Sequence, residues 1–79
     1  IHDDEAFRQE VAGMTVEGLQ RDLAAIGYRI LVNGVFDENT AAVVRAFQRR
    51  WRPERVNGEG DTETVTLANS VAALVAATE

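Results

Sequence analysis

The chain has 79 residues, of which 46% are hydrophobic and 27% charged, a composition that predicts one small globular domain and excludes a disordered segment. The formal net charge of −5 argues against a general nucleic-acid binder, because a phosphate backbone is met by clustered cations. Cys is absent, which excludes a disulfide frame and a thiolate metal site, and no apolar run approaches the ~20 residues that span a bilayer.

The N-terminal residues 1–14 are expected to form a linker or a short helix ahead of the main domain, residues 15–79. Phe7 and Val11 have the spacing of one helix face, and Gly13 follows where such a helix would end. The chain begins with Ile rather than with an initiating Met. We therefore expect it to be a piece excised or processed from a longer protein.

A second, better-marked helix is predicted from Thr15 to residue 26. The Thr15 hydroxyl suits an N-cap position, Met14 and Leu19 are placed as a hydrophobic staple, and Gly27 favours a helix end. Its apolar residues recur at helical spacing, which predicts one face packed on a core.

A nine-residue phrase occurs twice, at residues 32–40 and at residues 56–64, with Val, Asn, Gly, Asp and Thr at matching places. Asn-Gly favours a turn, because Gly adopts positive φ without strain and Asn tolerates it. Asp37 and Asp61 then stand where a carboxylate caps a helix start. Each copy is therefore interpreted as a turn followed by a capped helix.

The two capped helices complete the predicted architecture. The first runs from Asp37 toward Pro53, which ends it because the residue before Pro is pushed out of the helical region. The second begins at Asp61, and its apolar pattern continues to Ala77. We predict an all-α, compact three-helix bundle with two internally repeated turn-helix units and a short extra N-terminal helix. Its core is expected to include the following aromatic residues: Phe36, Phe47 and Trp51.

All eight cations are Arg, and five of them lie within residues 45–55, where Glu54 is the only acid. Arg binds carboxylates through two parallel hydrogen bonds, so this stretch suits a carboxylate-bearing ligand. A solvated helix end whose cations complement the helix dipole explains the same pattern.

An ordered set of residues resembles the peptidoglycan-binding-domain-like family. The set consists of Leu19-Gln20, Leu23, Gly27-Tyr28, Gly34, Phe36, Thr40, Val44, Phe47-Gln48, Val56, Gly58, Gly60, Thr64 and Leu67. The string at residues 46–53 is similar to the version at the C-terminal end of zinc-dependent N-acetylmuramoyl-L-alanine amidases. The resemblance implies a three-helix fold that binds bacterial cell-wall peptidoglycan and positions a catalytic partner. This chain departs from the family pattern at Asp37, where Gly is common.

Five residues are candidate ligand contacts. An amide both donates and accepts, which suits the acetamido groups of an amino sugar or the peptide bonds of a stem, and an aromatic face can stack on a sugar. Structural roles are the alternatives: a Gln bracing a helix end, an aromatic ring in the core, or a surface ion pair. The candidates are Gln20, Tyr28, Gln48, Arg49 and Arg52.

Catalytic chemistry finds little support in the sequence. His2 is the only His, and no Cys is available to complete a metal site, so we expect neither a metal nor a cofactor. The predicted function is noncatalytic binding of peptidoglycan, through its glycan strand or its stem peptide, in the periplasm, the cell wall or the secreted space. The domain is expected to target an attached hydrolase to this substrate, and the resemblance implies that the hydrolase is an N-acetylmuramoyl-L-alanine amidase. The alternative is a protein-interaction or propeptide-like domain on the same fold.

Overall fold

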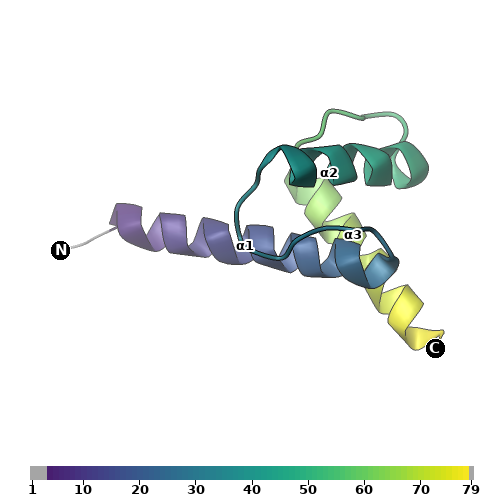
Figure 1. The fold of residues 1–79 in the computed structure, drawn as a ribbon, viewed down its shortest axis with the longest axis horizontal. Coiled ribbons are helices and arrows are strands. Elements are labelled where there is room, and N and C mark those ends of the chain that lie inside the picture. Colours follow the sequence, from purple (N-terminus) through teal and green to yellow (C-terminus); the bar gives the residue numbers. More distant parts are fainter. Residues whose placement is uncertain (1–3, 79) are drawn as a thin grey trace.

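Three α-helices make up the described part of the chain. The computed structural model describes the backbone of residues 4–78 and the side chains of residues 15–78. The helices are α1 (Asp4–Ile26), α2 (Glu38–Trp51) and α3 (Thr62–Ala77), and no strand occurs between residues 4 and 78. α1 packs mainly against α3, and its first turns extend beyond the other two helices (Figure 1). The predicted all-α three-helix bundle is confirmed.

α1 is one continuous helix of 23 residues, and this corrects two local predictions. Thr15 lies inside the helix and does not cap a helix start, and Gly13 does not end one. The physical reason is that a Gly inside a helix costs only about 1 kcal/mol relative to Ala, while no Pro interrupts the backbone hydrogen bonds on either side. The expected short extra N-terminal helix is therefore not a separate element, and the expected boundary between residues 14 and 15 lies within α1.

Gly27 ends α1, as predicted, and it does so in a Schellman motif. Its φ is 124°, a value that favours Gly, and its N–H donates to Ala24 O at 3.1 Å. The Tyr28 N–H donates to Leu23 O at 3.0 Å. These bonds satisfy the last carbonyls of the helix and turn the chain, so that Tyr28 packs against the core.

The two later helices begin and end as predicted. Asp37 is the N-cap of α2, where its Oδ1 accepts from the Thr40 N–H at 3.0 Å. Asp61 is the N-cap of α3, where its Oδ1 accepts from the Thr64 N–H at 2.9 Å. α2 ends at Trp51, two residues before the Pro.

The core holds Phe47, which is completely buried, but Phe36 and Trp51 are each 38% exposed, so their predicted place in the core is wrong. Phe36 belongs to the loop before α2, and Trp51 is in the last turn of α2, where it lines two surface hollows. The Trp51 ring still lies with its centroid 6.4 Å from that of Phe47. The buried core cluster contains Leu19, Leu23, Val44, Phe47, Ala68 and Val71.

Truncation of Phe47 tests this core. Phe47→Ala removes a completely buried ring and is expected to cost about 3–5 kcal/mol of unfolding free energy, enough to unfold most of so small a domain. Phe47→Leu, which keeps most of the volume, should cost about 1 kcal/mol and leave a measurable transition in urea. Phe36→Ala is the matched control. An equal loss in Phe36→Ala and Phe47→Ala would contradict this assignment of the core.

Candidate functional site

The side-chain amide of Gln20 in α1 closes on the loop before α2. Its Oε1 accepts from the N–H groups of Asn33 and Gly34, both at 2.9 Å. Its Nε2 donates to Asn33 Oδ1 at 3.2 Å, to Val35 O at 3.0 Å and to Thr40 Oγ1 at 2.9 Å. Gln20 is 0% exposed, so this amide is an internal brace between α1, the loop and α2.

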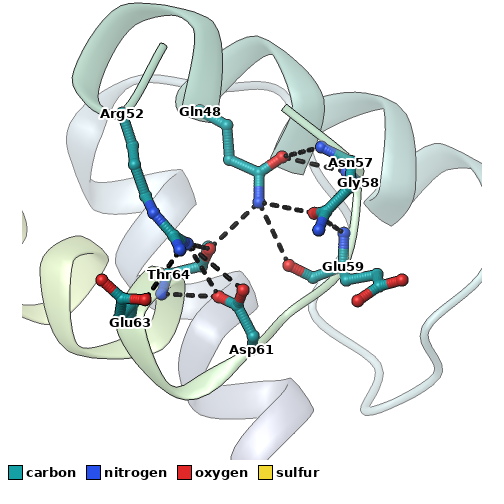
Figure 2. A network of polar contacts seen from close by, with 8 residues as sticks. All are labelled: Gln48, Arg52, Asn57, Gly58, Glu59, Asp61, Glu63 and Thr64. Carbon is teal, nitrogen blue, oxygen red and sulfur yellow. Dashed lines mark hydrogen bonds and ion pairs between the residues drawn. The ribbon is translucent and has the colours of Figure 1, made fainter. Parts of the chain in front are cut away.

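Gln48 in α2 makes the same set of bonds with the loop before α3 (Figure 2). Its Oε1 accepts from the N–H groups of Asn57 at 3.0 Å and Gly58 at 2.9 Å. Its Nε2 donates to Asn57 Oδ1 at 3.1 Å, to Glu59 O at 3.2 Å and to Thr64 Oγ1 at 3.0 Å. We call each of these arrangements an amide clamp: the Gln amide with its Asn-Gly loop and the Thr of the next helix.

The two Asn-Gly turns have matching geometry. Gly34 and Gly58 have φ values of 77° and 76°, and each Asn side chain accepts from the N–H two residues later, at 2.9 Å in the first loop and 3.0 Å in the second. A Cβ added at Gly58 would also lie only 2.9 Å from Arg45 Nη1. The repeated phrase in the sequence is therefore one half of a clamp, and the Gln of the preceding helix is the other half.

These bonds remove Gln20 and Gln48 from the set of ligand contacts. Both residues are 0% exposed, and every polar atom of the two amides already has a partner within the domain. A ligand would have to break a clamp to reach either amide. The structure thus supports the bracing role that the sequence left open.

Arg52 is also an internal residue. Its side chain is 7% exposed, and its Nη1 donates to Asp61 Oδ1 and to Thr64 Oγ1, both at 3.0 Å (Figure 2). Its Nη2 donates to Glu63 Oε1 at 2.8 Å. Arg52 therefore ties the end of α2 to the start of α3, and the prediction that it meets a ligand carboxylate is not supported.

Both capping carboxylates have lowered pKa values. The hydroxyl and N–H of Thr64 hold the pKa of Asp61 below its ordinary value of 3.8, and the Arg52 guanidinium adds to this effect. The Thr40 N–H is the main cause of the lowered pKa of Asp37. In both cases a helix N-terminus stabilises the ionised carboxylate.

Among the described side chains, four exposed arginines form no ion pair: Arg29, Arg49, Arg50 and Arg55. Of the predicted contacts, Arg49 is exposed on α2 and remains a candidate. Arg50 was not singled out from the sequence, although its place next to Trp51, as a cation beside an aromatic ring, was a signal that could have marked it.

A hollow of about 440 Å³ brings Tyr28 together with Arg50 and Trp51. The Arg50 guanidinium carbon lies 5.2 Å from the centroid of the Trp51 ring, within the range of a cation–π contact. Tyr28 is half-buried and meets the Phe47 ring edge to face, with an angle of 79° between the ring planes. Tyr28 thus closes the core, which is one of the two roles that the sequence left open, and because it also lines a surface hollow it remains a candidate ligand contact.

Three other hollows differ from this one in charge. One of about 390 Å³ at the junction of α2 and α3 is lined by Glu54 and Glu63 together with the paired Arg52. One of about 340 Å³ is mostly apolar and includes Glu59, and one of about 360 Å³ between α1 and α3 includes Asp22. Only the Tyr28 hollow, of these four, is lined by a cation and by no acid.

The described residues contain neither a candidate metal site nor a membrane-spanning helix. No group of three or more His, Cys, Asp or Glu side chains among them could hold a metal ion. None of the described helices is both long enough and apolar enough to cross a bilayer. His2 lies outside the described residues.

Comparison with known proteins identifies the family. Residues 12–67 match the family described as Putative peptidoglycan binding domain, and the chain belongs to that family. The matched range contains every residue of both amide clamps. A relative is the carboxy-terminal processing protease CtpA of Bacillus subtilis (strain 168), which is 32% identical over 57 residues, covering 72% of this chain and 12% of the protease. No solved structure matches the chain significantly.

Removal of one clamp tests its structural role. Gln48→Ala leaves the N–H groups of Asn57 and Gly58 and the Thr64 hydroxyl without this partner and opens a void, so we expect a loss of about 2–4 kcal/mol in urea denaturation. Arg49→Ala, the exposed neighbour, is the matched control and should change stability by less than about 0.5 kcal/mol. Equal stability of the two variants would show that the clamp does not hold the loop.

Acid titration tests the cap of α3. Because the pKa of Asp61 is lower in the folded chain than its ordinary value of 3.8, its contribution to stability is present above that value and is lost as pH falls through the folded-state pKa. Asp61→Asn keeps a capping oxygen but loses the charge that faces Arg52. The difference in Tm between the two proteins should be largest at neutral pH and should narrow between about pH 5 and about pH 2. A difference that is constant across this range would contradict the assignment.

Proposed function

We propose that this domain is a noncatalytic module that binds bacterial cell-wall peptidoglycan. The family match over residues 12–67 carries the proposal. The surface supports it, because the domain offers a hollow with aromatic walls and an unpaired Arg, features that suit a polymer of amino sugars and carboxylate-bearing peptides. The cell envelope is the location that this ligand requires.

The module would hold an attached enzyme against the wall. Support comes from the relative, in which the matching stretch is 12% of a protease, so a domain of this kind occurs within a much longer enzyme. Residues 46–53 favour a cell-wall amidase as the attached enzyme, by the resemblance described above. Two clamped loops give a rigid domain, which suits a part whose task is to fix the distance between enzyme and substrate.

A protein-interaction role is the second candidate, favoured by one observation. Apolar side chains stand exposed in the loop between α1 and α2, including Leu31 at 71%, Val35 at 56% and Phe36 at 38%. An apolar patch of this kind is typical of a surface that contacts another protein, and the attached enzyme is the partner that this candidate implies.

Pelleting with insoluble peptidoglycan tests the proposed function. We expect most of the domain in the pellet, and its release when soluble muropeptides are added. Leu31→Ser is the matched control for the second candidate: it removes exposed apolar surface and should leave the pelleted fraction unchanged. Recovery of the whole domain in the supernatant, under conditions where an established wall binder pellets, would overturn the proposal.

A further inference from the structure

Charge distinguishes the Tyr28 hollow from the other three hollows. Residues 15–78 contain eight acids and seven arginines, so no overall positive charge attracts an anion and the local charge of each hollow decides where one is favoured. Three of the four hollows contain at least one acid. The fourth contains Arg50 and no acid, and this arginine has no ion-pair partner among the described side chains. An anionic group is therefore favoured at this one hollow.

The contacts of Arg50 orient its guanidinium. An isolated surface Arg samples many rotamers, and ordering it on a ligand costs entropy. The cation–π contact with Trp51, in which the guanidinium carbon lies 5.2 Å from the ring centroid, restricts that freedom and leaves the guanidinium N–H groups without an ion-pair partner. A planar fork held in this way suits a carboxylate, which it can bind through two parallel hydrogen bonds.

The remaining lining is apolar and fits small alkyl groups. Ile26, Gly27 and Val75 line the hollow together with Tyr28 and Trp51. Its volume of about 440 Å³ lies within the usual range of small-ligand sites, roughly 300–1,000 Å³. A sugar has a poorer fit, because the Arg50 guanidinium already lies over the Trp51 ring and would compete with a pyranose for that face.

We propose that this hollow binds the carboxylate-bearing stem peptide of peptidoglycan, with Arg50 on a stem carboxylate and the walls of the hollow on the methyl groups of its alanines. The proposal rests on the proposed function and names the part of the polymer that is recognised. It replaces the predicted carboxylate contact of Arg52, which the ion pairs to Asp61 and Glu63 exclude.

The chain's single Trp lines the hollow and so reports binding without a label. Titration of the domain with a synthetic stem pentapeptide, L-Ala–γ-D-Glu–diaminopimelate–D-Ala–D-Ala, is expected to change the Trp51 fluorescence with a saturable curve. Chitotetraose, a neutral glycan, is expected to give no change. Arg50→Gln should weaken pentapeptide binding by about tenfold and flatten its dependence on salt, because a charge-assisted hydrogen bond is lost.

The matched control is Arg21→Gln, which makes the same change at an exposed Arg of α1 that lines none of the four hollows. Both variants should melt close to the parent, since neither side chain is buried. Two results would overturn this site and leave the proposed function intact. In the first, the wild-type domain pellets with peptidoglycan but does not bind the pentapeptide. In the second, the wild-type domain and the Arg50→Gln variant bind the pentapeptide equally well. A domain that fails to pellet at all would overturn the proposed function itself.

Discussion

The two amide clamps are the constraint on which the rest of this small domain depends. The segments between the helices contain no regular structure, and in a chain without Cys no disulfide can hold them. A buried amide is costly unless its donors and acceptor are satisfied, so each Gln is stable only when its loop is in place. The reverse also holds, because the Asn-Gly turn presents two N–H groups that need an acceptor. Loop and Gln therefore order each other, and the helices that they join acquire a fixed distance.

The clamps also explain why the repeated nine-residue phrase does not divide the domain into two structurally equivalent halves. α2 takes part in both clamps, since it offers Thr40 to Gln20 at its start and offers Gln48 to Thr64 near its end. Four residues after Gln48 stands Arg52, which pairs with the cap of α3, whereas four residues after Gln20 stands Ala24, which is exposed. The second loop is thus fixed by an additional ion pair. The first loop keeps apolar side chains at the surface and is the less constrained of the two.

Local rules predicted the features that local energy decides. The caps at Asp37 and Asp61, the Gly27 terminus and the end of α2 before Pro53 each depend on a few neighbouring residues, and all are present. Thr15 shows the limit of the same rules, because a suitable cap residue does not start a helix where nothing ends the previous one. The clamps required a tertiary argument, although one signal was available: Thr40, Val44, Gln48 and Arg52 follow each other at a spacing of four. All four are buried, so an amide on the stripe that faces the core is a structural amide.

In the proposed site, recognition depends on side chains that do not hold the fold together. Three of the polar residues that the sequence suggested as ligand contacts are bonded inside the domain: Gln20, Gln48 and Arg52. The polar side chains that remain for a carboxylate ligand are the exposed arginines. Because salt screens charges beyond about 8–10 Å at ordinary ionic strength, a ligand experiences the local charge of one hollow rather than the net charge of the domain. Arg50 is one step along α2 from the exposed Arg49 and two steps from the buried Arg52, and helical geometry gives these neighbours different faces. Helix geometry therefore gives the arginines of this run different surroundings: Arg52 meets α3 and stabilises the fold, whereas Arg50 lies beside Tyr28 in the proposed binding site.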